Sequence, residues 1–334
     1  MTDPTIPSRA EGLTDKLTLV TGGFGFLGLN LTMALRHAGA RVRVLTRSWP
    51  PDLVVSREEL AEVDVYRGDI RDEAVVDAAV ADADLVFHLA GKSGSAVSNA
   101  SPAEDLDVNL RGLLNVLVAC ARHAPSARLI FPSSRLVYAP DQPLPVSEIG
   151  RLGPISIYGT HKLAAERYLE VFRRESGLSY VVLRITNPYG PFQRREQHSY
   201  GIINWFIWRA LNDLPLQVYG EGSQLRDYVH ADDVVDAMML AAISPAADGM
   251  VMNVGGGHSV TFAHMAELVA ASAGSGRLEH IPWPENQARV ETGHFAADIS
   301  LIKSTLGWEP ARALDAGIAG VVQAYRELVA GRRG

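Results

Sequence analysis

The chain has 334 residues, of which 47% are hydrophobic and 21% charged, a composition typical of one large or two modest globular cores. Its 31 Lys and Arg are outnumbered by 38 Asp and Glu, and this net charge of -7 argues against nucleic-acid binding, which needs a basic surface. The single cysteine, Cys120, cannot form an internal disulfide, and the first fifteen residues contain no apolar signal segment. No apolar stretch is long enough to span a membrane, so a cytoplasmic protein is expected.

Short β-rich runs alternate with longer amphipathic segments from residue 17 to about residue 187. This alternation predicts parallel strands joined by crossover helices, an α/β fold with a doubly wound sheet of the Rossmann type. The predicted strands are 17–21, 41–45, 63–66, 85–89, 128–132 and 180–185, and the predicted helices are 27–38, 72–81, 106–123 and 158–176. Ligands of such sheets bind at the carboxyl ends of the strands, where the functional loops are therefore expected.

The regular alternation stops after about Asn187, where two prolines and a glycine interrupt the chain. We expect a dinucleotide-binding domain over residues 14–187 and a smaller α/β lobe for the substrate over residues 188–330, with a segment near 228–255 returning to the first domain. Further helices are predicted at 202–211, 232–243, 262–273 and 315–330, an apolar run at 250–254 and a loop at 282–293.

The first predicted strand runs into the segment TGGFGFLG (21–28), which places three glycines directly before a helix. Without side chains, backbone N–H groups can approach a diphosphate, and the start of the helix adds positive potential. A tight turn without a ligand would not need a strand before it and a helix after it. The pattern therefore predicts a dinucleotide site that includes Gly22, Gly25, Phe26, Leu27 and Gly28.

The ends of the second and third predicted strands bear on the choice of cofactor. NAD-binding proteins usually place an acidic side chain after the second strand, whereas this chain has Thr46 followed by Arg47. The guanidinium favours the 2'-phosphate of NADP, unless Arg47 is simply solvated. Asp69 and Ile70 follow the third strand and could contact adenine, unless they only form a turn.

Tyr158 and Lys162 are four residues apart and share one face of a predicted helix. An ammonium beside a phenol is expected to lower the tyrosine pKa from about 10 toward neutrality, which would make Tyr158 an acid/base; the alternative is an ordinary helix pair. Ser134, at the end of the predicted strand 128–132, could hydrogen-bond the same substrate oxygen, although serines in such positions commonly cap helices.

Four motifs in this order, TGGFGFLG, HLAG (88–91), SSRLVY (133–138) and YGTHK (158–162), resemble those of extended short-chain dehydrogenases/reductases. The resemblance is to the NAD-dependent epimerase/dehydratase family, which includes UDP-glucose/UDP-galactose 4-epimerases, and it covers nearly the whole chain. It implies tightly bound NAD, with NADP as the alternative because of Thr46 and Arg47, and a homodimer formed through segments 106–123 and 158–176. The catalytic set it implies is Ser134, Tyr158 and Lys162, and further cofactor contacts come from Leu89, Ala90 and Gly91.

The same resemblance implies a nucleotide-sugar substrate whose diphosphate is contacted by Asn187 and clamped by Arg226. The structural alternative for Arg226 is an ion pair with Asp227 or Asp233. Loops around residues 189–200 and 214–219 are expected to set sugar specificity. The candidates there are Gln217, Tyr219 and Arg194, of which Arg194 could face an acidic sugar such as a uronate or simply be solvated; no metal site is expected.

The two positions after Ser134 limit which of the family's reactions the chain could catalyse. The family's 4,6-dehydratases carry Asp and Glu after the catalytic Ser or Thr, and its decarboxylases carry Glu, whereas this chain has Arg135 and Leu136. Reactions that need those carboxyl groups are therefore not expected. We expect C4 epimerisation of a nucleoside-diphosphate hexose or hexuronate through a transient 4-keto sugar. The alternatives are NADPH-dependent reduction of a 4-keto-deoxyhexose and a non-catalytic nucleotide sensor.

Overall fold

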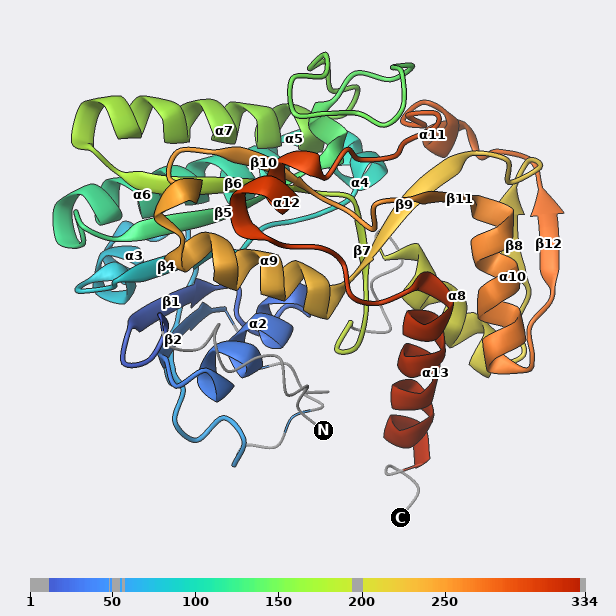
Figure 1. Cartoon of the computed structure of the whole chain (residues 1–334), viewed down its shortest axis with the longest axis horizontal. Helices are drawn as coiled ribbons and strands as arrows, with labels where there is room; N and C mark the ends of the chain where they lie inside the picture. The colour runs from blue at the N-terminus through green and yellow to red at the C-terminus, as the bar shows by residue number, and fades with distance from the viewer. Residues whose placement is uncertain (1–11, 48, 50–54, 56–57, 194–200, 331–334) are drawn as a thin grey trace.

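The computed structural model describes residues 12–47, 49, 55, 58–193 and 201–330. Its main element is a sheet of seven parallel strands in the order β10-β6-β5-β4-β1-β2-β3 (Figure 1). The strands are β1 (Leu17–Thr21), β2 (Arg41–Thr46), β3 (Asp64–Arg67), β4 (Leu85–His88), β5 (Arg128–Ser134), β6 (Ser179–Ile185) and β10 (Val251–Val254). The predicted doubly wound α/β fold is confirmed, and six of these strands lie within two residues of the predicted bounds.

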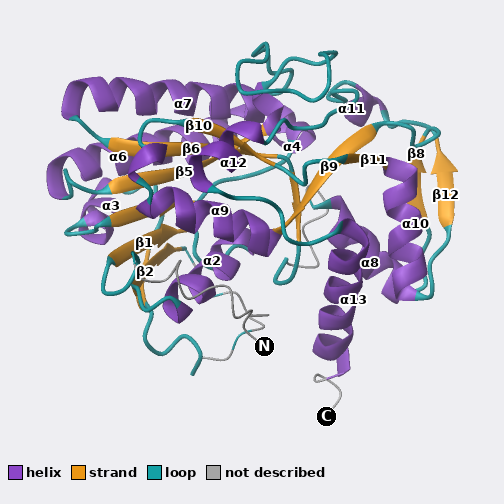
Figure 2. Ribbon diagram, in the orientation of Figure 1, coloured by secondary structure: helices purple, strands orange, loops and turns teal. Residues whose placement is uncertain are grey.

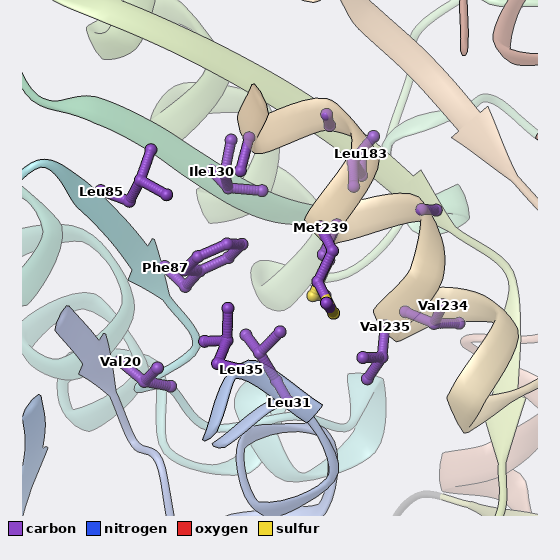
Figure 3. Close-up of a cluster of buried hydrophobic side chains, with 14 of the residues drawn as sticks. Val20, Leu31, Leu35, Leu85, Phe87, Ile130, Leu183, Val234, Val235 and Met239 are labelled. Carbon is purple, nitrogen blue, oxygen red and sulfur yellow. The ribbon is translucent and has the colours of Figure 1, made fainter. Parts of the chain in front are cut away.

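Helices cover both faces of this sheet (Figure 2). One face carries α2 (Phe26–His37) and α9 (Ala231–Ile243), and the other carries α3 (Glu73–Val80), α6 (Gly112–His123) and α7 (Ile157–Ser176). Each face of the sheet has its own hydrophobic core, and successive residues of one strand belong to opposite cores, as Leu19 and Val20 of β1 show. Figure 3 shows the core on the α2 side, where Leu35 and Met239 face Phe87. Strands buried on both faces must be almost continuously apolar, and this made them recognisable.

The segment predicted as one helix over 106–123 is a π-helical turn, η1 (Leu106–Arg111), that continues into α6. Within η1 the Asn109 side chain accepts a hydrogen bond from the backbone N–H of Lys92 at 2.8 Å and donates to its carbonyl at 3.0 Å. These bonds fix the loop after β4 to the start of the helix. Because π-turns often occur at functional sites, the irregularity marks this loop for attention.

The remaining elements form a smaller lobe beside the carboxyl ends of the strands (Figure 1). Two small sheets comprise β7 (Asn187–Tyr189), β9 (Leu225–His230) and β11 (Ser259–Thr261), and β8 (Leu216–Tyr219) and β12 (Leu278–Ile281). Helices α8 (Ile202–Leu211), α10 (Phe262–Ala273) and α13 (Leu314–Ala330) pack around the lobe's own core. The chain returns to the large sheet in between, because α9 covers it and β10 extends it.

Short helices complete the chain. They are α4 (Ser95–Ala100), α5 (Pro102–Asp105), η2 (Arg135–Val137), η3 (Pro245–Ala247), α11 (Glu285–Ala288) and α12 (Ser300–Leu306). Of these, α11 lies inside the segment 282–293 that was predicted as a loop. Across the described residues, no helix has both the length and the apolar character that crossing a membrane requires.

Candidate active site

A pocket of about 500 Å³ lies between the carboxyl ends of the large sheet and the smaller lobe. Residues of the turn after β1, the loop after β4 and the start of α7 line one side, and β8, β9 and the segment around α11 line the other. It brings together most of the residues predicted from sequence, namely Gly22, Gly25, Phe26, Leu27, Gly28, Leu89, Gly91, Ser134, Tyr158, Lys162, Asn187, Tyr219 and Arg226.

Other predicted residues are not part of this lining. They are Thr46, Arg47, Asp69, Ile70, Ala90 and Gln217. Arg47 and Gln217 are exposed, and Ala90 packs against the turn at Gly22. Arg194 lies outside the described residues.

Backbone geometry builds the glycine-rich end of the pocket. Gly22 has a φ of +68°, and a Cβ there would lie 2.8 Å from the backbone of Ala90. A Cβ on Gly28 would lie 2.2 Å from the carbonyl oxygen of Gly22. Helix α2 begins at Phe26 without a side-chain cap, so the N–H groups of its first turn remain available to an anion. This turn fits the diphosphate of a dinucleotide.

Asp69, predicted to contact adenine, is held by its neighbour Arg71. Its carboxylate accepts hydrogen bonds from the Arg71 backbone N–H at 2.9 Å, from Nε at 2.9 Å and from Nη2 at 2.7 Å. These bonds and the charge of Arg47 lower the pKa of Asp69 against the opposing effect of burial. An adenine amino group there would have to share the carboxylate with Arg71.

Tyr158 and Ser134 meet in the pocket. The side chains of Ser93 and Ser134 interact with the Tyr158 phenol and act to lower its pKa. Tyr158 lies in the first turn of α7, where Ser156 caps the helix and Ser98 Oγ accepts the Tyr158 backbone N–H at 3.0 Å. The fold thus places this phenol at the end of β5, in the pocket that the glycine-rich turn also lines.

The sequence predicts that Lys162 lowers the pKa of Tyr158. For the protein side chains alone, without a cofactor, this prediction is wrong. Burial raises the pKa of Tyr158 to about 12, although the interactions with Ser93 and Ser134 act in the opposite direction. Lys162 Nζ donates to the carbonyl of Pro132 at 2.8 Å and lies 5.8 Å from the Tyr158 ring centroid. Burial also lowers the pKa of Lys162, to about 8. The lysine therefore lies near the ring but is anchored to the backbone of β5.

Asn187 and Arg226 both line the pocket, and both already have protein partners. Asn187 Nδ2 donates to the carbonyl of Asp227 at 2.7 Å. Arg226 forms an ion pair with Glu291 at 2.5 Å and donates to the carbonyls of Leu225 and Gly293. The alternative considered for Arg226, a pair with Asp227 or Asp233, is not what forms.

Those two aspartates have other partners. Asp233 pairs with Arg312 at 2.7 Å, and Asp227 accepts hydrogen bonds from Thr186 and from two backbone N–H groups.

Four further pocket residues were not among the predicted site residues. Ser93 interacts with the Tyr158 phenol, and Glu291 pairs with Arg226. Arg135 donates to Thr292 Oγ1 at 2.8 Å and to Asn187 Oδ1 at 3.4 Å, and Tyr228 lies on β9. Only Arg135 carried a sequence signal, as the residue in place of a family carboxylic acid, because the other contacts arise from tertiary packing.

Known proteins resemble the chain over nearly its full length. A family model described as "NAD dependent epimerase/dehydratase family" matches residues 18–255. A dTDP-glucose 4,6-dehydratase of Streptomyces niveus is 30% identical over 323 residues, 92% of each chain. A UDP-glucose 4-epimerase of Mycolicibacterium smegmatis is 31% identical over 314 residues, 92% of this chain and 98% of its own. The solved UDP-glucose 4-epimerase of Thermotoga maritima with UDP-glucose has 31% identity and a TM-score of 0.85, covering 94% of this chain and 99% of that chain.

Proposed function

The chain belongs to the NAD-dependent epimerase/dehydratase family, and on that premise we propose that it inverts C4 of a nucleoside-diphosphate hexose or hexuronate. We take the nucleotide to be UDP, as in the Thermotoga maritima relative. One observation carries the proposal. Tyr158 and Ser134 line the pocket together and Ser134 lowers the Tyr158 pKa, while the next two positions hold Arg135 and Leu136 rather than carboxylic acids. The site therefore offers acid/base chemistry at a carbinol without the groups needed to eliminate water.

NAD is the cofactor of the family, and when bound it supplies a hydride acceptor and a positive charge. The turn from Gly22 to Gly28 is the part of this chain that would hold its diphosphate. Tyr158 would accept the proton of the sugar 4-hydroxyl and later return it. Ser93 and Ser134 favour the phenolate by donating hydrogen bonds to it, which opposes the effect of burial.

Inversion requires the 4-keto sugar to turn over within the pocket while it remains attached. Asn187 and Arg226 would hold the diphosphate during this rotation, so hydride can return to the opposite face of the ring. Arg226 would then exchange Glu291 for the diphosphate. The smaller lobe closes the pocket opposite the sheet and would limit the access of water to the ketone.

The proposal is tested by incubating the protein with UDP-glucose, UDP-glucuronate or UDP-N-acetylglucosamine without added cofactor and following the anomeric signals by NMR. We expect one sugar to be converted to its galacto isomer. Loss of water to give a 4-keto-6-deoxy sugar would identify a dehydratase instead, and no conversion of any nucleotide sugar would favour a non-catalytic sensor.

The second candidate is an NADPH-dependent 4-ketoreductase, favoured by Thr46 and exposed Arg47 at the end of β2. The two enzymes differ in what the purified protein contains. Denaturation should release stoichiometric NAD from an epimerase, whereas a reductase should consume added NADPH with a 4-keto-deoxyhexose substrate.

We also propose that the chain forms a homodimer through η1 with α6 and through α7; of these, η1 exposes Leu106 and α7 exposes Val171. Sedimentation equilibrium of wild type and of Val171→Glu would test this, since a charge in a dimer interface should yield monomers.

A further inference from the structure

Among the described residues, two guanidinium groups line the substrate side of the pocket, and their partners differ. Arg226 is neutralised by Glu291 at 2.5 Å. Arg135 has no ion-pair partner within the described part of the chain; Thr292 Oγ1 and Asn187 Oδ1, which accept its hydrogen bonds, are both uncharged. The Arg135 guanidinium also lies over the Phe295 ring, 5.4 Å from its centroid. It is therefore oriented by neutral groups and forms no ion pair among the described residues, while the charges of Glu291 and Asp227 act on it without direct contact.

A buried hydroxyl accompanies this cation. Tyr228 lies on β9, lines the pocket and is only 6% exposed. Its hydroxyl has no hydrogen-bond partner among the described residues. The positive charges of Arg226 and Arg135 act on the Tyr228 phenol and oppose the rise in its pKa that burial causes. Since buried hydroxyls nearly always find a partner, this one is available to a ligand in the pocket.

Charge decides what kind of ligand suits this subsite. Burial and the nearby Arg226 lower the pKa of Arg135 to about 9, still above neutral pH, so the guanidinium stays protonated. A protonated guanidinium can only donate hydrogen bonds, and the Tyr228 hydroxyl can donate one more. An acceptor with negative charge fits both groups, and a carboxylate matches the planar fork of arginine.

The position of Arg135 indicates where on the substrate this anion lies. Arg135 directly follows Ser134, which under the proposed function binds the oxygen on C4 of the sugar, and its guanidinium also reaches Asn187, which would hold the diphosphate. C5 is bonded to C4, whereas the diphosphate is attached at C1, across the ring. In a hexuronate, the carboxylate on C5 is therefore the anionic group nearest to the C4 oxygen.

We propose that Arg135 and Tyr228 form a subsite for the C5 carboxylate of a nucleoside-diphosphate hexuronate, so that Arg135 helps to select an acidic sugar. This inference rests on the proposed function in taking Ser134 to mark C4. It concerns binding, however, and can be measured without turnover.

The test compares UDP-glucuronate with UDP-glucose, which share the nucleotide and diphosphate and differ in the C5 substituent. Calorimetry on the full chain saturated with NAD should show tighter binding of UDP-glucuronate to wild type. Arg135→Met should weaken UDP-glucuronate about 10- to 100-fold and UDP-glucose less than about threefold, because only the former loses a charge-assisted hydrogen bond. Arg135→Lys, which keeps the charge, should restore part of the loss.

Two further variants complete the design. Tyr228→Phe should weaken UDP-glucuronate about three- to tenfold while leaving the melting temperature unchanged, because its hydroxyl has no described protein partner. Arg174→Met, at a side chain that is 74% exposed on α7, is the matched control and should change neither affinity.

Equal losses for both sugars in Arg135→Met would assign Arg135 to the diphosphate and overturn the proposal. So would a wild type that prefers UDP-glucose or fails to bind UDP-glucuronate. Failure of the proposed function has a different signature, since selective binding of UDP-glucuronate would then persist without inversion at C4.

Discussion

The two sides of the pocket are prepared for a ligand in different ways. On the sheet side the contacts come from backbone, in the turn at Gly22 and Gly28 and the uncapped start of α2. On the lobe side they come from charged side chains, as in the pair between Arg226 and Glu291. A turn fixed by steric contacts cannot rearrange cheaply, whereas an ion pair can exchange one partner for a ligand. The sheet side, which would hold the cofactor under the proposed function, is therefore preformed, and the lobe side, which would hold the substrate, can exchange ion-pair partners.

The largest effect is expected at Tyr158, where the two sides meet. Tyr158→Phe removes the proton acceptor and should lower turnover about 10²- to 10⁴-fold. Nucleotide binding should be retained, because the phenyl ring keeps its place in α7. Turnover by NMR and UDP affinity by calorimetry check both parts, with Tyr168→Phe on the same helix as control. Turnover within about threefold of wild type would show that Tyr158 does not handle the proton.

The preformed turn can be broken with one methyl group. Gly28→Ala places a Cβ 2.2 Å from the Gly22 carbonyl oxygen, so the turn must shift. We expect loss of NAD binding and a decrease of about 1–3 kcal/mol in the free energy of unfolding. Gly320→Ala is the matched control, because a Cβ on Gly320 in α13 would meet nothing within 4 Å. If Gly28→Ala binds NAD like wild type, the turn does not hold the dinucleotide.

The sheet side also buries a neutral histidine at its strand ends. Burial and the Lys162 charge lower the pKa of His88 from 6.5 to about 3, and its Nδ1 lies 3.0 Å from Thr21 Oγ1. Since the folded state disfavours the charged ring, its contribution is complete above pH 6.5 and is lost as the pH falls toward 3. Between pH 7 and 5 the loss should be about 2 kcal/mol in the free energy of unfolding.

Urea titrations at both pH values measure this slope in wild type and in His88→Gln, which should lack most of it. His264→Gln, at an exposed position on α10, serves as control. An unchanged slope in His88→Gln would assign the acid sensitivity to other groups.

The smallest effect is expected for the ion pair between Arg226 and Glu291. Glu291→Gln removes the carboxylate that competes for Arg226, and UDP affinity should rise about two- to fivefold, the range expected for a partly exposed ion pair. Glu285→Gln, an exposed change on α11, should have no effect. Weaker UDP binding in Glu291→Gln would mean that the carboxylate orients Arg226 rather than occupying it.

The contrast between the sheet side and the lobe side of the pocket also explains how much of the fold and the site could be predicted from sequence. The strands, the glycine turn, Ser134, Tyr158 and Lys162 lie in local patterns whose spacing reflects one strand or one helix. The pairing of Arg226 with Glu291 and the contact of Arg135 with Thr292 join residues far apart in the chain, and no local spacing encodes them. The Tyr158 pKa was predicted in the wrong direction, because the ammonium was visible in the sequence and the burial was not.

The most direct measurement uses UDP-sugar carrying deuterium at C4, incubated with the purified protein without added cofactor. If hydride leaves C4 and returns to its other face, NMR should show the C4 epimer with its deuterium retained. Inversion with loss of deuterium to water would contradict hydride transfer at C4, and retained configuration for every nucleotide sugar would contradict epimerisation itself.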